Sequence, residues 1–296
     1  MKVSLIERIL SSRNKRLNNL KQKVIQYLSQ LPGNVITEEQ SQVLTYLNNN
    51  DITVFPYPFN KEYDSFEADV QYDQNLNLYF TMVDGKKLYY KKGSLKKAKR
   101  YFKAISIEQD KRSPHCYLSE SFNINQNDNV VDVGAAEGNF SLSIIEKAKQ
   151  VILFEPDKNW VKALEATFSP WKEKVTIINK FVSNISDKRK GVVCLDDFFK
   201  ENQPVNFIKA DVEGSEIKLL QGSRVILEGN SDLKIAICTY HNQDDAEQIE
   251  SILNTHKFNC DYSPGYMLYY YGRSNVVKEP YLRKAILRAT KAESLS

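Results

Sequence analysis

The chain has 296 residues, of which 42% are hydrophobic and 26% are charged, and its formal net charge is +4 at pH 7. This balance is typical of a folded globular protein, and so small a net charge does not by itself indicate nucleic-acid binding. Four widely spaced cysteines without a Cys-x-x-Cys pair argue against a zinc knuckle or a disulfide framework and favour reduced thiols. The charged N-terminus and the lack of a long apolar run predict a cytoplasmic protein without a transmembrane segment.

Residues 1–112 are expected to form an extension that begins with helices. Apolar residues recur at helical spacing from Leu5 to Leu28, and the Pro-Gly pair after them stops the pattern. Thr37 and Gln40 have the spacing of a capping box, which predicts the start of a second, shorter helix.

A hairpin and a basic helix are expected next. Apolar and polar residues alternate on both sides of Asp84-Gly85, a strong signal for a two-residue turn. The segment 86–103 that follows is rich in lysine and interleaved with tyrosine. Such a segment is most simply a solvated helix face, and the alternative is a docking face for an acidic acceptor. We expect the extension to form a lid or an acceptor platform.

From about Asn129 the chain alternates between continuous apolar strands and helices. This pattern predicts an α/β domain over residues 113–275, with a doubly wound, mostly parallel, Rossmann-like sheet. The segments 175–183 and 215–227 are each expected to be one element, a strand and a helix, and the residues around 262 and 268–271 to be extended. The tail 276–296 is predicted to be a basic amphipathic helix that packs on the domain or contacts a partner, with an anionic membrane surface as the alternative.

The first strand-to-helix turn of such a sheet meets the ligand, and here it reads VVDVGAAEGNF, Val130 to Phe140. The glycine spacing is Asp-x-Gly-x-x-x-Gly, from Asp132 through Gly134 to Gly138, and not that of a dinucleotide fingerprint. An aspartate would repel a pyrophosphate at close range but would attract a positively charged cofactor. S-adenosylmethionine, with its sulfonium and ammonium groups, fits this requirement.

Glu155 ends the second strand, where an acid can accept hydrogen bonds from both ribose hydroxyls. Enzymes that use NAD share an acid at this place, so Glu155 alone does not distinguish the two cofactors. The spacing of Asp132 and Gly138 does distinguish them, and it disfavours an NAD-dependent oxidoreductase.

Two later strands end in residues suited to chemistry. The stretch FIKADVEGSE delivers Lys209, Asp211 and Glu213 to one strand end, where the simpler alternative is an internal ion pair that orders the loop. Tyr240 and His241 end the next strand. A histidine there suits proton transfer at neutral pH or metal binding, although a lone histidine is more often structural.

The stretches VVDVGAAEGNF, VILFEPD, LDDFF, FIKADVEGSEIKLLQGSRVIL and AICTYH together resemble the FkbM family of S-adenosylmethionine-dependent methyltransferases, over roughly residues 125–268. The resemblance implies methylation of hydroxyl groups, often on sugars of glycans or on macrolides. It implies that Asp132, Gly134, Gly138 and Glu155 hold the cofactor and that Asp211, Glu213 and His241 border the reacting centre. Ala210 departs from the family, which often has a larger aliphatic residue there.

The predicted site combines these positions with their neighbours. Asp211, Glu213 and His241 are the candidate catalytic residues, and the same three would hold a divalent metal if one is used. His115, Tyr240 and Lys209 are the candidate substrate contacts. The predicted cofactor-binding residues are Asp132, Gly134, Ala135, Gly138, Asn139, Glu155, Pro156, Ser183 and Asp211.

The sequence therefore predicts an O-methyltransferase that acts on a sugar, a nucleotide sugar or a lipid-linked glycan. An exocyclic amine acceptor would call for a polar-aromatic clamp after the fourth strand, and ADVEG stands there instead. Two alternatives stay open: an RNA methyltransferase that uses segment 86–103, and a catalytically silent module that binds the cofactor. No specific nucleic acid is expected as a partner, and a homodimer is left open.

Overall fold

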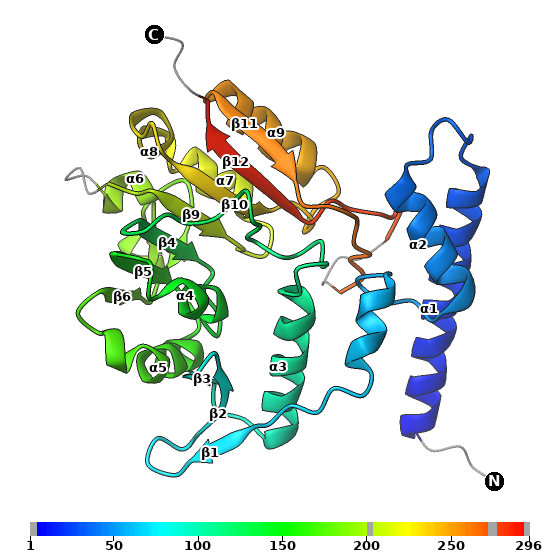
Figure 1. Cartoon of the computed structure of the whole chain (residues 1–296), viewed down its shortest axis with the longest axis horizontal. Helices are drawn as coiled ribbons and strands as arrows, with labels where there is room; N and C mark the ends of the chain where they lie inside the picture. The colour runs from blue at the N-terminus through cyan, green and yellow to red at the C-terminus, as the bar shows by residue number, and fades with distance from the viewer. Residues whose placement is uncertain (1–4, 200–203, 272–276, 293–296) are drawn as a thin grey trace.

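The computed structural model describes residues 5–199, 204–271 and 277–292. Its N-terminal part begins with two helices that pack together along one side of the molecule (Figure 1), α1 (Leu5–Gln30) and α2 (Glu38–Asn49). The predicted capping box is confirmed at the start of α2. The backbone N–H of Gln40 donates to Thr37 Oγ1 at 3.2 Å, and the Thr37 N–H donates to Gln40 Oε1 at 3.0 Å.

A short 3-10 helix, η1 (Pro58–Tyr63), leads into a small antiparallel sheet. The sheet contains β1 (Gln71–Asp73), β2 (Leu78–Val83) and β3 (Lys86–Tyr89). The predicted hairpin is confirmed, since Asp84 and Gly85 both have positive φ, 48° and 76°, as a tight two-residue turn requires. The basic helix also forms, as α3 (Leu95–Glu108), which packs on β2.

The centre of the molecule is a mostly parallel sheet, as predicted. Within the described residues it has seven strands in the order β11-β12-β10-β9-β4-β5-β6. All neighbouring pairs from β10 to β6 are parallel, and β12 runs antiparallel to both of its neighbours. The strand order reverses between β4 and β9, which is where an open α/β sheet binds its ligand. The strands are β4 (Asn129–Val133), β5 (Gln150–Phe154), β6 (Val175–Ile178), β9 (Phe207–Ala210), β10 (Lys234–Cys238), β11 (Phe258–Tyr262) and β12 (Ile286–Lys291).

Helices cover both faces of this sheet (Figure 1). Successive residues of β4 point to opposite faces, so that Val130 belongs to one buried cluster and Val131 to the other. The first cluster includes side chains of α4 and α5, and the second includes side chains of α6 to α9. The α-helices are α4 (Asn139–Ile144), α5 (Lys158–Thr167), α6 (Leu195–Phe198), α7 (Glu216–Gln221), α8 (Arg224–Gly229) and α9 (Asp245–Thr255). Two short 3-10 helices, η2 (Ser169–Trp171) and η3 (Lys188–Lys190), lie between them.

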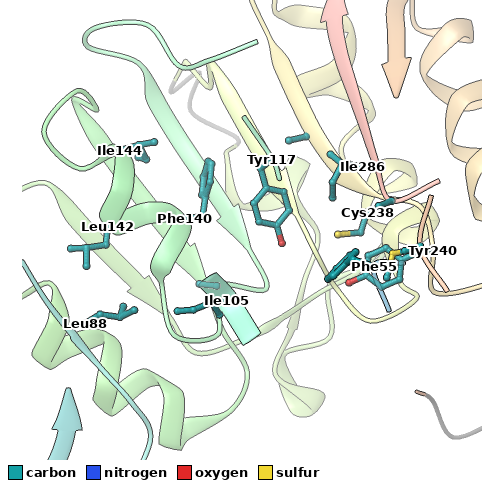
Figure 2. Packing of buried hydrophobic residues seen from close by; sticks show 14 of the residues in the cluster. Phe55, Leu88, Ile105, Tyr117, Phe140, Leu142, Ile144, Cys238, Tyr240 and Ile286 are labelled. Atoms are coloured by element: carbon teal, nitrogen blue, oxygen red, sulfur yellow. The ribbon is translucent and has the colours of Figure 1, made fainter. Parts of the chain in front are cut away.

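The N-terminal extension shares its core with the sheet. Phe55 and Ile105 of the extension belong to the same buried cluster as Tyr117, Cys238 and Tyr240 (Figure 2). The extension is therefore packed against the carboxyl end of β10, beside the ligand-binding edge of the sheet.

The predicted C-terminal helix is wrong, because the segment forms β12 instead. This strand lies between β10 and β11 and is hydrogen-bonded on both sides, so the tail 276–296 contributes a strand to the sheet. Ile286 and Leu287 are fully buried, and Arg288 lies inward as well. Its guanidinium donates hydrogen bonds to the carbonyls of Cys116, Tyr117 and Leu118 at 2.8–3.2 Å. These hydrogen bonds allow the arginine, which the sequence analysis had assigned to a basic helix, to lie buried in the strand.

Two other predicted elements are each divided. The strand expected over 175–183 breaks after β6, and the chain continues as β7 (Phe181–Val182), which pairs with β8 (Val192–Val193) in a separate sheet. The helix expected over 215–227 breaks at Gly222, between α7 and α8. A Cβ on Gly222 would lie 2.4 Å from the Ser183 carbonyl oxygen. The lack of a side chain at Gly222 therefore allows the backbone between α7 and α8 to approach the backbone that follows β7.

The extended piece predicted at 268–271 belongs to none of the strands of the described ranges. It is hydrogen-bonded to the extension, since the Leu268 N–H donates to the Val54 carbonyl. Just before it, Met267 forms an isolated antiparallel β-bridge with Arg283 of the C-terminal segment. No helix in the described part of the chain is both long enough and apolar enough to cross a membrane.

Candidate active site

The glycine turn after β4 lies tightly against the loop after β9. Gly134 has φ of +77°, and a Cβ on it would lie 1.8 Å from the backbone oxygen of Asp211. Gly138 has φ of +82°, and a Cβ there would meet Leu164 Cδ2 at 2.6 Å. Gly134 therefore allows two strand ends to meet, whereas Gly138 allows α4 to pack on α5 and does not line the cavity described below.

Asp132 lies beneath this turn and not on a cavity wall. Its side chain is fully buried, and it accepts a hydrogen bond from Ser141 Oγ at 2.7 Å. Lys209 Nζ lies 3.0 Å from Asp132 Oδ1 and donates to the Gly134 carbonyl at 2.7 Å. Asp132 is thus paired with a lysine, and neither Asp132 nor Lys209 lines the two cavities described below. Together they hold the glycine turn in place.

In the ion pair of Lys209 with Asp132, the lysine is charged. Burial by itself lowers the pKa of Lys209, but the carboxylates of Asp132 and Asp211 outweigh it and raise that pKa well above the usual value. The ammonium is therefore charged at neutral pH. Removing either Lys209 or Asp132 would leave an uncompensated buried charge, which is strongly destabilising.

Glu155 ends β5 as predicted, and both of its oxygens face backbone donors. Oε2 accepts the Ala136 N–H at 2.9 Å, and Oε1 accepts the Asp157 N–H at 2.7 Å. Burial raises the pKa of Glu155 above its usual value, although the two backbone hydrogen bonds oppose this. Each carboxylate oxygen has a further lone pair, so Glu155 can still accept hydrogen bonds from a ligand.

A cavity of about 310 Å³ opens between the glycine turn, the end of β5 and the loop after β9. Of the predicted cofactor residues, Gly134, Glu155, Pro156 and Asp211 line it. Ala135, Asn139 and Ser183 are not among its lining residues, and other side chains, several of them within VVDVGAAEGNF and VILFEPD, take their place. The residues that the prediction missed are Val133, Ala136, Phe154, Asp157, Trp160, Lys180, Phe181, Val182, Val212 and Ser215.

A second, larger cavity of about 1250 Å³ lies between the extension and the ends of β9 and β10. Glu213 lines both cavities, so the two adjoin at this residue. Aromatic and polar side chains from distant parts of the chain form its wall. The lining residues are Leu17, Ile52, Thr53, Val54, Phe55, Asn60, Ala104, Ile107, Glu108, His115, Glu213, Tyr240, His241, Asn242, Met267, Tyr269, Tyr270 and Tyr271.

The three candidate catalytic residues meet where the cavities adjoin. His241 Nε2 lies 3.6 Å from Asp211 Oδ1 and 3.7 Å from Glu213 Oε2. Glu213 is 85% exposed along its side chain and has φ of +53°, a conformation that is strained for a residue with a Cβ. The loop therefore holds the Glu213 carboxylate outward at the junction.

Glu216 is a site residue that the sequence analysis missed. It is fully buried at the start of α7, and its Oε1 accepts the Val212 N–H at 2.9 Å. The same oxygen lies 2.9 Å from His241 Nδ1, which is ion-pair distance but falls outside hydrogen-bond geometry. Glu216 therefore faces one ring nitrogen of His241, while the other nitrogen faces Asp211 and Glu213.

The pKa of His241 is raised above its ordinary value. Burial lowers it, but Glu216, followed by Asp211 and Glu213, raises it by more. Asp211, Glu216 and His241 also form one of two groups of potential metal ligands in the described residues, with Glu216 in the place where the sequence suggested Glu213. The other group is His115, Asp211 and Cys238.

His115 and Tyr240 are brought together behind Asp211. His115 Nε2 lies 3.0 Å from the Tyr240 hydroxyl, and Tyr117 donates to Asp211 Oδ2 at 2.9 Å. Burial lowers the pKa of His115 to about 4, so its ring is neutral at physiological pH. Burial alone would raise the pKa of Asp211, but Lys209 and the two histidines bring it below the ordinary value.

Two further carboxyl groups, which the sequence analysis did not assign to the site, interact electrostatically with this centre. Glu108, in the last turn of α3, lines the larger cavity, and burial, followed by the charges of Glu137 and Asp211, raises its pKa to about 8. Burial raises the pKa of Glu137 to about 7. Glu108 is therefore mostly protonated at neutral pH and Glu137 about half so, and neither adds a full negative charge at the junction.

The fold and this site define a methyltransferase of the Rossmann-like class. A family model described as "Methyltransferase FkbM domain" matches residues 89–264, which is more than half of the sequence. The chain therefore belongs to the FkbM methyltransferase family, and the suspected relationship is confirmed. A search of curated proteins found no match.

Several solved structures are similar over part of the chain. A methyltransferase FkbM from Methylobacillus flagellatus KT is 20% identical, with a TM-score of 0.46, over 60% of this chain and 50% of its own. An rRNA methylase from Streptococcus thermophilus is 17% identical, with a TM-score of 0.39, over 57% and 90%. Trm5b from Pyrococcus abyssi is 15% identical, with a TM-score of 0.41, over 73% and 56%. This chain thus spans half the length of the Methylobacillus protein.

Proposed function

We propose that this protein transfers a methyl group from S-adenosylmethionine to a hydroxyl group of a sugar or glycan. The observation that carries the proposal is the junction of the two cavities at Glu213, with His241 beside it. A cofactor in the smaller cavity and an acceptor in the larger one would meet there. Most of the catalysis of a methyl transfer can come from such positioning.

The smaller cavity suits the proposed cofactor. Glu155 is placed to accept the ribose hydroxyls, and the apolar walls from Trp160, Phe181 and Val182 suit an adenine ring. The Asp211 carboxylate, which lines this cavity and has a lowered pKa, suits the positive charges of the methionine part. When bound, the cofactor supplies an electrophilic methyl group on a sulfonium.

His241 is the proposed general base. The Glu216 carboxylate, 2.9 Å from Nδ1, favours a proton on that nitrogen, which leaves Nε2 to take the proton of an acceptor hydroxyl. The carboxylates of Glu216, Asp211 and Glu213 outweigh burial and stabilise the resulting imidazolium, as the raised pKa of His241 indicates. Asp211 and Glu213, close to the same nitrogen, would hold the acceptor or the protonated ring.

The larger cavity supports a carbohydrate acceptor. Tyr240, Tyr269 and Tyr271 offer aromatic faces for sugar rings, and Glu108 and Glu213 can accept hydrogen bonds from hydroxyl groups. A volume of about 1250 Å³ exceeds that of a pocket for one small molecule, so an oligosaccharide would fit. We propose that the extension is an acceptor platform, because residues from its helices and loops form much of this wall.

The test is to incubate the protein with radiolabelled S-adenosylmethionine and a panel of sugars, nucleotide sugars, lipid-linked glycans and RNA. We expect label in a glycan, and much less with the His241→Ala variant at saturating cofactor. Label in RNA would support the rival function, and cofactor binding without any turnover would support the silent module.

A chelator titration of the active reaction separates two versions of the mechanism. Unchanged turnover in excess chelator would support His241 as a base without a metal. Loss of turnover that a divalent cation restores would instead place a metal at Asp211, Glu216 and His241.

A further inference from the structure

A strongly basic region lies at the small sheet and the start of α3. Segment 86–103 holds nine Lys and Arg residues and no acid, although the whole chain has a formal net charge of only +4. The remainder of the chain is therefore net acidic. Within α3, Lys96, Lys99 and Arg100 are exposed, whereas Ala98 and Ile105 are buried against the fold.

Large apolar side chains are exposed in the same region. Tyr72, Leu76, Met82 and Leu95 are exposed by 47%, 49%, 44% and 41%, and they are four of the nine exposed large hydrophobic residues of the described ranges. Such residues are ordinary when they are scattered singly, but a cluster of them marks an interaction site.

These residues belong to one continuous part of the structure. The small sheet β1–β3 and the N-terminal end of α3 lie together at one end of the molecule (Figure 1), and α3 packs on β2. Leu76 and Lys92 line the same surface hollow of about 530 Å³. We name the surface formed by residues 71–100 the basic platform.

Some charges of the basic platform have partners within the protein. Lys91 pairs with Asp157 at 2.9 Å, and Lys87 lies over the Phe80 ring. Asp73 accepts a hydrogen bond from Tyr89, and Asp84 occupies the hairpin turn. The exposed cations of Lys92, Lys96, Lys97, Lys99 and Arg100 still outnumber these acids.

We propose that the basic platform docks the protein on an anionic phospholipid surface. Exposed aliphatic side chains among lysines match the boundary between acyl chains and anionic headgroups, where each basic residue adds attraction. RNA would use the cations and aromatic rings but gain little from Met82 and Leu95. This inference does not depend on which acceptor is methylated.

Docking in this orientation leaves the larger cavity accessible. The basic N-terminal end of α3 belongs to the platform, whereas Glu108 at its other end lines the cavity. A helix of 14 residues is about 20 Å long. The cavity would therefore stand above the headgroups and stay open to solvent.

Cosedimentation with vesicles tests the proposal. We expect the full chain to bind vesicles of phosphatidylglycerol and phosphatidylcholine, to bind pure phosphatidylcholine weakly, and to be released by salt. The double variant Lys96→Glu/Arg100→Glu should lower binding to the anionic vesicles at least about tenfold. The matched control Lys147→Glu/Lys149→Glu makes the same change in net charge on another exposed surface and should bind nearly as well as the wild type.

A second variant separates a lipid surface from RNA. Met82→Ser/Leu95→Ser should weaken binding to anionic vesicles but leave any binding of a single-stranded RNA probe unchanged. Equal loss in the two charge-reversal variants, or RNA binding without vesicle binding, would overturn the proposal. Circular dichroism and thermal unfolding of each variant confirm that it is folded.

Discussion

Replacing Glu216 by glutamine tests how His241 is tuned. The substitution keeps an oxygen that can accept the Val212 N–H but removes the negative charge 2.9 Å from His241 Nδ1. A hydrogen bond or ion pair to a charged group is worth about 1.5–3 kcal/mol, which corresponds to a decrease of about one to two units in the pKa of His241.

The pH dependence of kcat/KM follows from the raised pKa of His241. In the wild type the carboxylates raise the pKa of His241 above 6.5, so the ring is protonated below that pKa and cannot act as a base. The kcat/KM should therefore rise with pH through the His241 pKa. In Glu216→Gln this limb should move to lower pH, and the plateau should fall by roughly 10²–10⁴ because the ring loses its orientation and its stabilised charge.

Two measurements follow the change. The first is the pH profile of kcat/KM with labelled cofactor, and the second is an NMR titration of the histidine ring protons. The chain has only three histidines, so their signals can be assigned by substitution. Glu247→Gln, on the exposed side of α9, is the matched control and should change neither. An unmoved His241 titration together with an unchanged plateau in Glu216→Gln would refute the reasoning.

Three further predictions concern other residues. Gly134→Ala should lose cofactor affinity in calorimetry or fail to fold, because its Cβ would lie 1.8 Å from the Asp211 oxygen, whereas alanine at the exposed Gly33 should be tolerated. His115 has a pKa of about 4 when folded, so stability should fall by up to about 3 kcal/mol as pH drops from 6.5 to 4, and His115→Gln should remove this loss in urea unfolding. Glu108 has a pKa of about 8 among Glu137, Asp211, Glu213 and Lys209, so stability is lost as pH rises from 4.5 through 8. Glu108→Gln should therefore have a higher Tm than the wild type above pH 8 and a similar Tm near pH 4.5, and equal Tm values at both would contradict this.

Local signals predicted much of the fold. The capping box at Thr37 and the turn at Asp84-Gly85 depend on neighbouring residues alone, and both form as expected. The continuous apolar strands indicated a mostly parallel sheet for the same reason. The C-terminal strand was missed because its place depends on distant partners, β10 and β11, and because the buried Arg288 is satisfied by carbonyls some 170 residues away.

The active site likewise has features that the sequence predicts and others that depend on tertiary packing. Parallel strands end at one edge of a sheet, so the sequence could place Asp211, Glu213 and His241 near one another. It could not show that Lys209 would neutralise Asp132, because that depends on the register of β4 against β9. Glu216 ends the FIKADVEGSE stretch but had no role assigned to it, and Glu108 lies outside the motifs; only the packing of α7 and α3 brings their carboxyl groups to the site.

The most direct test of the central claim is the structure of the methylated product. NMR of the glycan that gains label from S-adenosylmethionine would show whether the new methyl group is bound to oxygen. We predict a methyl ether on a sugar ring, formed by the wild type and strongly reduced in the His241→Ala variant. A methyl group on nitrogen, or a methyl ether formed at the full rate without His241, would contradict the account.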